Sequence, residues 1–302
     1  MIKQRTLKNE TEVTGIGIHS GQIVCLTLKP APEDAGIIFR RVDLNPTVEV
    51  SACFDTIGDT TLCTSLQQKD VKIVTVEHLL SALAGLGIDN AYVDLTGSEV
   101  PILDGSAAPF VALIQKAGIK EQHALKKFIR IKKTLFVEDG EKTAKLMPYN
   151  GFKISCTIDF SHHAVLRDLP KNATIDFARD SYVDDISRAR TFGFMSDYQK
   201  LRDHGFAKGA SLNNTLVIDD TRILNEGGLR YPDECVKHKI LDLIGDLYLI
   251  GHNLLGAFEG YKSGHTLNKK LLHALCTEKD AWEYVTFKAI DEAPPMGYLS
   301  AA

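Results

Sequence analysis

One stretch, residues 237–247, constrains the fold more than any other part of this chain. Its apolar residues recur with helical spacing, and they are Ile240, Leu241, Leu243, Ile244 and Leu247. On a helix His238, Asp242 and Asp246 lie one turn apart on the same face. Because an unpaired buried carboxylate is costly, this polar stripe predicts either a helix with one solvated edge or a helix that presents ligands to a site.

A second polar pair stands at the start of a helix in the first half of the chain. Residues 71–76 alternate as a strand does, and Glu77 then opens an amphipathic helix that ends at Gly85 and Gly87. Neighbours on a helix point about 100° apart, so Glu77 and His78 both line a cleft only at the edge of the element. The alternative is that Glu77 is a favourable first-turn anion and His78 is exposed.

The rest of the first half reads as strands, turns and one more helix. Residues 2–41 alternate between apolar and polar side chains and carry glycine and proline turns, which predicts antiparallel strands. A strand is expected at 90–95, a turn at 101–106 and a helix at 108–117. The charged stretch 120–127 then predicts a linker.

A similar order recurs after this linker. Strands are expected around 128–137, 145–148 and 152–160, then helices, and the helix of His238 precedes an apolar run at 253–258. This order hints at two similarly built halves, each of which gives a helix end to a shared cleft.

Segment 194–217 fits neither half. It predicts a helix between two short strands, with aromatic and small residues mixed. Such a segment can wall an apolar channel, and the alternative is ordinary packing.

The composition favours a soluble protein that acts on a small molecule. A length of 302 residues suggests about two domains. With 44% hydrophobic and 25% charged residues and a net charge of −4, the chain has no basic stripe for nucleic acid and no polybasic cluster for a membrane surface. No apolar segment follows Met1, so we expect neither export nor membrane insertion but a cytoplasmic protein.

The six cysteines are widely spaced and include no Cys-x-x-Cys pair, which favours reduced thiols over disulfides. We interpret five of them as small core residues: Cys25, Cys53, Cys156, Cys235 and Cys276. Cys63 lies just upstream of the Glu77–His78 pair, and its role stays open.

Three residues from the two halves together offer the ligand types of a zinc site. They are His78, His238 and Asp242, and a fourth position stays open, as in catalytic rather than structural zinc sites. His265 follows a glycine turn at the start of a further helix, a common place for a catalytic histidine. His19 lies between glycines at a turn, where it either projects into a cleft or is structural.

Several motifs, in this order along the chain, resemble one enzyme family. They are the glycine-rich turn 14–21, the pair Glu77–His78, the turn 101–106, the helical residues 238–242 and the turn 261–265. On these residues, and over nearly its whole length, the chain resembles the zinc-dependent UDP-3-O-acyl-N-acetylglucosamine deacetylases of lipid A biosynthesis.

This resemblance implies an α+β fold of two domains, residues 1–124 and 125–302. Each would be a small mixed or antiparallel sheet layered against helices, in a β-α-α-β sandwich. The active site would lie in the cleft between them, with Glu77 on the first domain and His265 on the second. Segment 194–217 would be a βαβ insert that forms a passage for the acyl chain.

The resemblance also implies hydrolysis of the N-acetyl group of a UDP-acyl-sugar, which releases acetate and a free amine in the committed step of lipid A biosynthesis. His78, His238 and Asp242 would hold one Zn²⁺, for which Fe²⁺ could substitute in the cell. Glu77 would be the general base and His265 the general acid.

Other roles are implied in the same way. Asp246 would orient His265, Thr191 would help to hold the oxyanion, and Lys239 would add positive charge near the substrate. Further candidate substrate contacts are Phe192, Phe194, Lys262 and His19. By residue type alone, Phe160 and Phe194 are candidates to stack on the base, and Lys262 is a candidate to meet a phosphate.

Some points stay open at this stage. His163 follows His162 where family members often have proline, which affects the loop after Phe160 and its contacts to the nucleotide. A metal-free UDP-sugar or acyl-binding module and a zinc amidase for another substrate are the alternative functions. We expect a monomer, and the preferred acyl length is undetermined.

Overall fold

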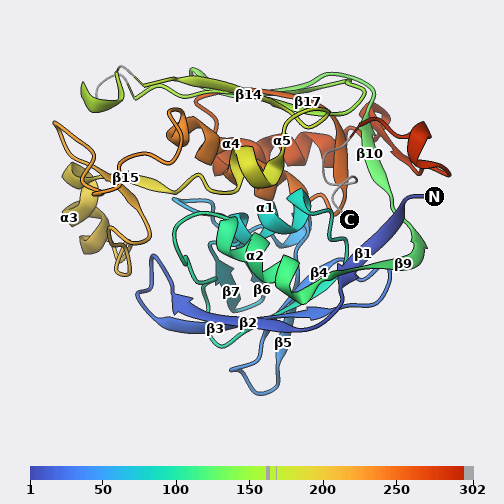
Figure 1. Ribbon diagram of the computed structural model, residues 1–302, viewed down its shortest axis with the longest axis horizontal. Helices are drawn as coiled ribbons and strands as arrows, with labels where there is room; N and C mark the ends of the chain where they lie inside the picture. The colour runs from blue at the N-terminus through green and yellow to red at the C-terminus, as the bar shows by residue number, and fades with distance from the viewer. Residues whose placement is uncertain (161–163, 168, 296–302) are drawn as a thin grey trace.

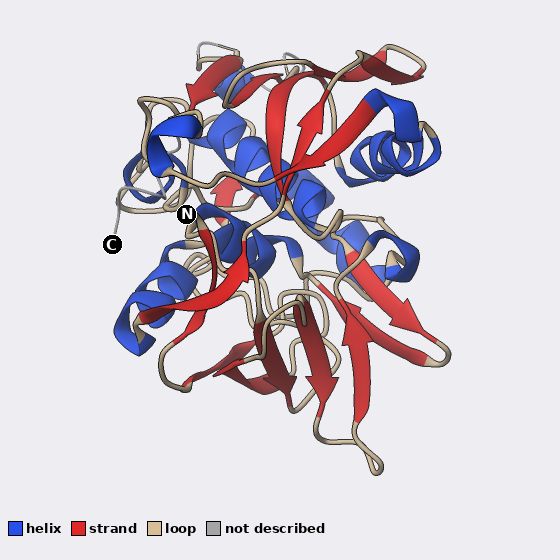
Figure 2. Ribbon diagram, turned by 90° about the vertical axis from the view of Figure 1, so that its right-hand side faces the viewer, coloured by secondary structure: helices blue, strands red, loops and turns tan. Residues whose placement is uncertain are grey.

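The protein folds into layers in which helices lie between two β-sheets (Figure 1). The structure is a computed structural model that describes residues 1–160, 164–167 and 169–295. One sheet lies at the bottom of Figure 1 and the other at the top, and Figure 2 shows the helices between them. This arrangement confirms the predicted α+β fold of two similarly built, layered halves.

The first half consists of a five-stranded sheet, two helices and two short ribbons. The sheet has the order β2-β3-β8-β4-β5. Its strands are β2 (Thr11–Ile16), β3 (Ile23–Pro30), β4 (Ile37–Arg41), β5 (Val48–Ser51) and β8 (Ala91–Leu95). The helices are α1 (Glu77–Gly85) and α2 (Ala108–Ala117). The ribbons are β6 (Ser65–Gln68) with β7 (Val71–Val74), and β1 (Lys3–Leu7) with β9 (Ile119–Leu125).

The second half repeats this plan with a larger sheet. The long strand β17 (Asn253–Tyr261) is its centre and pairs with β10 (Phe128–Ile131), β12 (Lys142–Met147) and β13 (Phe152–Thr157). The outer strands are β11 (Leu135–Asp139), β14 (Asn172–Asp176) and β18 (Trp282–Val285). The covering helices are α4 (Glu234–Tyr248) and α5 (His265–Thr277). Short helical turns lie at Phe54–Thr56, Ala164–Leu166, Tyr182–Ile186, Lys279–Ala281 and Ile290–Glu292.

The segment that fitted neither half is a βαβ insert at one end of the molecule (Figure 1). It consists of β15 (Phe192–Phe194), α3 (Met195–Asp203) and β16 (Leu216–Ile218), and the two strands pair in parallel. The predicted helix between two strands is therefore confirmed. No residue of α3 is fully buried, so this helix covers a surface and forms no part of the core.

One expectation about the first half is wrong, and another holds only in part. The stretch 120–127 is mainly β9 rather than a linker, because its backbone pairs antiparallel with β1. In residues 2–41, β2 and β3 are antiparallel as expected, but β4 pairs in parallel with β8. The strand pairs among the described residues lie on one side or the other of Lys126, and the domain boundary at 124/125 stays a prediction.

Helix α1 is more deeply buried than an amphipathic pattern suggests. All nine of its residues are buried, because α1 is short and packs against α4 as well as against its own half of the molecule. A helix that is buried all round cannot hide a charge at its edge unless that charge has partners. The Glu77–His78 pair at its first turn therefore needs partners from the second half.

Gly245 of α4 permits this close approach. A Cβ atom at Gly245 would lie 2.0 Å from the carbonyl oxygen of Glu77 and 3.0 Å from its Cα. Both atoms belong to backbone, which cannot rotate away as a flexible side chain can. The absence of a side chain at Gly245 thus brings α4 against the first residue of α1.

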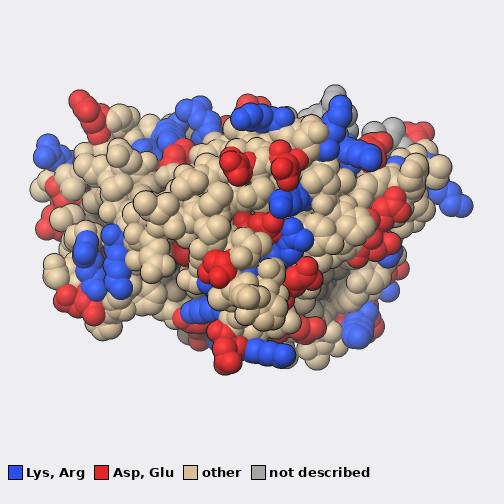
Figure 3. Space-filling view, turned by 90° about the horizontal axis from the view of Figure 1, so that it is seen from below, with Lys and Arg blue, Asp and Glu red and all other residues tan. Residues whose placement is uncertain are grey.

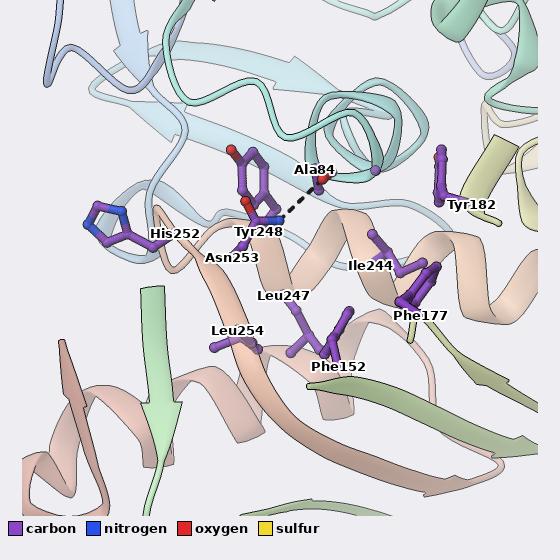
Figure 4. A pocket seen from close by; sticks show the side chains of 11 residues that line it. Ala84, Phe152, Phe177, Tyr182, Ile244, Leu247, Tyr248, His252, Asn253 and Leu254 are labelled. Atoms are coloured by element: carbon purple, nitrogen blue, oxygen red, sulfur yellow. Dashed lines mark hydrogen bonds between the residues drawn. The ribbon is translucent and has the colours of Figure 1, made fainter. Parts of the chain in front are cut away.

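Further along the same seam lies a small cavity, between the end of α1, α4 and the start of β17 (Figure 4). Its volume is about 40 Å³ and its walls are mainly apolar. Asn253 Nδ2 donates to the Ala84 carbonyl at 3.2 Å across it. A water molecule needs about 10–15 Å³ measured in this way, so the cavity has room only for very small molecules.

The charged side chains and the helix lengths bear on whether a segment can span a membrane. Acidic and basic side chains are interspersed on the face in Figure 3. Among the described residues, no helix has both the length and the apolar character needed to cross a bilayer.

The contact at Gly245 leads to a stability prediction. Gly245→Ala should destabilise the protein by about 1–3 kcal/mol, the usual range for overpacking, although alanine in a free helix interior would stabilise it by about 1 kcal/mol. Urea unfolding measures this difference. Gly227→Ala is the control, because a Cβ there meets nothing within 4 Å. Equal stability of the two variants would contradict the role of Gly245.

Candidate functional site

Three side chains from α1 and α4 converge at the seam between the halves. One ligand atom from each of His78, His238 and Asp242 lies within 4.8 Å of the others. Asp242 Oδ1 is 3.4 Å from His78 Nε2 and 3.3 Å from His238 Nε2. All three residues are buried, so the solvated-edge alternative for α4 and the exposed alternative for His78 are both wrong.

The hydrogen bonds of this cluster suit a cation. His238 Nδ1 lies 3.0 Å from the Ala189 carbonyl, which can only accept, so Nδ1 carries the proton and Nε2 turns a lone pair toward Asp242. Burial lowers the pKa of His238 to about 3, which keeps the imidazole neutral. Within the described residues, Asp242 Oδ1 is buried without a hydrogen-bond partner. Two imidazole nitrogens and an unpartnered carboxylate oxygen are the donors that Zn²⁺ takes.

Lys239 stabilises the charge of this carboxylate. Its Nζ lies 2.5 Å from Asp242 Oδ2, the oxygen that faces away from the two histidines. Burial opposes ionisation of Asp242, but its electrostatic interactions with the His238 imidazole and the Lys239 ammonium hold its pKa well below the usual range. Asp242 is therefore ionised and oriented before any cation binds.

A second carboxylate, Glu77, lies directly beside the cluster. It is buried, its Oε2 accepts the backbone N–H of Thr64 at 3.0 Å, and its Oε1 is 3.8 Å from His265 Nε2. Burial raises the pKa of Glu77 to about 7, although the charge of His265 opposes this shift. A carboxyl group with such a pKa can both take and return a proton near neutral pH.

His265 at the start of α5 faces Glu77 and is held by Asp246. Its Nδ1 donates to Asp246 Oδ2 at 2.8 Å. Burial lowers the pKa of His265, but the charge of Asp246 and the hydrogen bond to it outweigh burial and raise the pKa to about 9. At neutral pH the imidazole is therefore charged, and it can donate a proton from Nε2.

Two neighbours of Asp246 have no counterpart among the residues expected from the sequence. Thr64 Oγ1 donates to Asp246 Oδ1 at 2.5 Å, and Asn268 Nδ2 donates to Asp246 Oδ2 at 2.8 Å. Asn268 lies three residues after His265, on the same helical face, so helical spacing could have indicated it. Thr64 is distant in sequence from Asp246, and no local pattern marks it.

The loop before β15 is fixed by a buried ion pair. Glu234, the first residue of α4, accepts from Arg190 Nε at 2.8 Å and from the Arg190 backbone N–H at 3.0 Å. The Thr191 N–H donates to the Gly105 carbonyl at 2.7 Å. These contacts hold the Ala189 carbonyl against His238 and place Thr191 at the edge of the cluster.

Three clefts that share lining residues surround the metal-ligand cluster. The metal-ligand cleft, of about 640 Å³, includes Glu77, His78, His238, Asp242 and His265. The apolar passage, of about 420 Å³, runs under the insert and is lined by residues such as Ile18, Phe194, Leu201, Ala207 and Val217. The polar cleft, of about 570 Å³, is lined by residues such as Asp159, Phe160, Lys239, Lys262 and His265. Leu62 lines all three clefts.

The expected substrate contacts are distributed over these clefts. Phe192 and Phe194 line both the metal-ligand cleft and the apolar passage, and the Phe160 ring lies 5.5 and 5.6 Å from theirs. Lys262 lines the polar cleft, where its Nζ pairs with Glu141 at 2.7 Å. It also pairs with Asp159 at 3.0 Å, so a phosphate at Lys262 would have to compete with two carboxylates.

His19 lies apart from the metal-ligand cluster. It lines the apolar passage, where its ring packs edge-on against Phe206 at 5.4 Å. Its backbone N–H donates to the buried Glu99 at 2.8 Å, which fixes the turn. The structure thus places His19 beside the passage and not among the three ligand residues.

The cysteines are all free, as expected, but they are less uniformly buried. Cys25 on β3, Cys53 before a short helical turn and Cys276 near the end of α5 are only partly buried. Cys63 is buried, and burial raises its pKa to about 12, so it remains a neutral thiol. His163 lies outside the described residues.

Comparison with known proteins agrees with this geometry. The profile of the UDP-3-O-acyl N-acetylglycosamine deacetylases (LpxC) matches residues 4–277. The chain is 60% identical over 299 residues to the UDP-3-O-acyl-N-acetylglucosamine deacetylase of Saccharophagus degradans, covering 99% of this chain and 98% of the relative. The same identity holds over 296 residues with the Nitrosococcus oceani enzyme of that name, covering 98% and 97%, and over 294 residues with that of Coxiella burnetii, covering 97% of each. The chain therefore belongs to the UDP-3-O-acyl N-acetylglycosamine deacetylase family, and it is a deacetylase.

Proposed function

We propose that this protein hydrolyses the N-acetyl group of UDP-3-O-acyl-N-acetylglucosamine and so releases acetate and the free amine, in the committed step of lipid A biosynthesis. The observation that carries the proposal is the unpartnered Asp242 Oδ1, set between two histidines and next to Glu77 and His265. Family membership and the names of the relatives support the choice of substrate. We also propose that the enzyme works as a monomer in the cytoplasm.

The cofactor that fits this donor set best is one Zn²⁺, held by His78, His238 and Asp242. Fe²⁺ is an alternative occupant in the cell, because imidazole also suits iron. When bound, the ion supplies Lewis acidity, which polarises an amide carbonyl and lowers the pKa of water. Lys239 keeps Asp242 charged, with its Oδ1 toward the two histidines that would hold the ion with it.

Glu77 acts as the general base in this proposal. Thr64 occupies its Oε2, which leaves Oε1 to take the proton of the attacking water. A carboxyl pKa of about 7 in the free protein is matched to proton transfer at neutral pH.

His265 acts as the general acid. An amine is a good leaving group only when it is protonated, and Asp246 keeps the imidazole charged and commits Nδ1, so that Nε2 is the donor. Thr191 stabilises the negative oxygen through its hydroxyl, because its N–H and carbonyl are already bonded to Gly105 and Leu216.

The apolar passage and the polar cleft suit the two ends of the substrate. The apolar passage, with Phe192, Phe194 and His19 in or beside its walls, accommodates an acyl chain. The polar cleft offers Lys239 and Lys262 to a diphosphate, and the Phe160 ring to the uracil. The acetamide then lies between them, at the metal-ligand cleft.

A turnover assay tests the proposed function. The purified protein should release acetate from UDP-3-O-acyl-N-acetylglucosamine, lose this activity on chelation and regain it with Zn²⁺. Absence of acetate release by the metal-loaded protein would overturn the proposal.

Removal of a ligand should remove the metal. His238→Ala should bind much less than one equivalent of Zn²⁺ and lose activity, because only two protein ligands remain. His273→Ala on α5 is the control, since this exposed histidine packs against Phe54 and is not one of the three ligand residues. Elemental analysis after gel filtration gives the metal content, and full occupancy of His238→Ala would exclude it as a ligand.

Loss of the base should spare the metal. Glu77→Gln keeps an acceptor for the Thr64 N–H but cannot take a proton, so we expect an intact fold, full metal content and turnover lower by roughly 10²- to 10⁴-fold. Steady-state kinetics with metal analysis of the same sample measure both quantities. An unchanged turnover number would assign the base to another group.

The two pKa shifts predict a bell-shaped profile of kcat/KM against pH. The base must be deprotonated, so activity rises with pH through the pKa of Glu77; the acid must be protonated, so activity falls through the pKa of His265. These values are about 7 and 9 without metal, and a bound cation lowers both. Because Glu77 and His265 interact, the pKa values read from the two limbs of the profile describe the pair of groups and not each residue alone.

Asp246→Asn removes the charge that raises the pKa of His265, so the alkaline limb should move to lower pH. NMR titration of His265 in the metal-free variant provides an independent measurement. An alkaline limb that stays in place would argue against His265 as the acid.

A further inference from the structure

Thr64 makes hydrogen bonds to both sides of the active site. Its backbone N–H donates to Glu77 Oε2 at 3.0 Å, and its hydroxyl oxygen lies 2.5 Å from Asp246 Oδ1 and 3.1 Å from His265 Nδ1. Its own carbonyl accepts the Val76 N–H at 3.2 Å, which ties it to the start of α1. Thr64 is buried and lines none of the three clefts.

The direction of each bond follows from its partners. A charged carboxylate only accepts, so the Thr64 hydroxyl donates its proton to Asp246 Oδ1. Its oxygen then presents lone pairs to the His265 Nδ1–H, which is already shared with Asp246 Oδ2 at 2.8 Å. One residue thus fixes a rotation of the Glu77 carboxylate, a rotation of the Asp246 carboxylate and the plane of the His265 ring.

The local backbone indicates that this loop is held in place. Leu62, two residues earlier, has φ of 65°, which non-glycine residues rarely adopt. Such a conformation persists where the surrounding contacts determine it. On the other side, Ser65 Oγ donates to the Asp59 carbonyl at 2.7 Å and closes the loop.

We propose that Thr64 is a positioning residue that sets the relative placement of Glu77, on the first half, and the His265–Asp246 pair, on the second. This inference rests on the proposed function, in which those groups are base and acid. In that function, Glu77 takes a proton from the water that attacks the amide carbon, and His265 gives a proton to the amide nitrogen. Small errors in the separation of the two residues reduce the rate without affecting binding.

The test compares isosteric variants in the zinc-loaded enzyme. Thr64→Val removes the hydroxyl and keeps the N–H to Glu77, so kcat should fall about 10- to 100-fold, as for other supporting residues around an active site. KM and zinc content should stay close to wild type, because Thr64 lines none of the three clefts and is not a metal ligand. Thr64→Ser restores the hydroxyl and should recover most of kcat.

Thr6→Val is the matched control for the loss of a buried hydroxyl. Thr6 Oγ1 donates to the Asn90 carbonyl at 2.7 Å and accepts from the Ala31 N–H at 3.0 Å, in the ribbon of β1. Its variant should lose stability to a similar degree and keep kcat.

Two further measurements separate positioning from a general structural role. In the metal-free protein, the NMR signal of the His265 Nδ1–H should shift in Thr64→Val and not in Thr6→Val. In a His265→Ala background, the cost of Thr64→Val in kcat should shrink to about twofold or less, because the acid that the hydroxyl orients is gone.

The same assay distinguishes failure of the proposed function from failure of the role proposed for Thr64. A wild-type enzyme without deacetylase activity overturns the proposed function. An active wild type together with a Thr64→Val enzyme whose kcat lies within about twofold of it overturns only the inference. The inference also fails if Thr64→Ser is as slow as Thr64→Val, or if the loss is undiminished without His265.

Discussion

The close approach of α1 and α4 at Gly245 is the contact on which the active site depends. Each half of the molecule carries only part of the site, with Glu77 and His78 on α1 and His238, Asp242 and Asp246 on α4. A side chain at position 245 would collide with the backbone of Glu77. The distances among the ligand atoms are thus a property of helix packing, and protein interiors yield little to such strain.

Burial at this contact also determines the chemistry. Removal of Glu77 from water raises its pKa, and the same burial lowers that of His238, so one carboxyl can exchange protons near neutral pH and one imidazole stays neutral for a cation. The pKa of His265 is raised instead, because the charge of Asp246 outweighs the effect of burial. His238 and His265 line the same cleft but differ in protonation because their neighbours differ. The neutral His238 suits a metal ligand, and the charged His265 suits a general acid.

The sequence was sufficient for the parts of this site that repeat at helical spacing. The stripe on α4, the pair at the start of α1 and the histidine after the glycine turn were recognisable, because each is a local pattern within one element. Burial was less accessible: α1 looked amphipathic, and stretch 120–127 looked like a linker. The partners that bury α1 and pair β9 lie far away in the chain, so periodicity alone carries no trace of them.

Contacts between loops and helices were the least predictable. Thr64 and Asp246 are 182 residues apart, and a threonine in a polar loop has many structural uses. Its importance arises only once the loop before β6 lies against α1, α4 and α5, where the Thr64 N–H reaches Glu77 and its hydroxyl reaches Asp246 and His265. Residues that bind a metal are restricted to a few types, and a pattern of types can therefore reveal them. Residues that position others are restricted only by geometry, so they become visible only after the chain has folded.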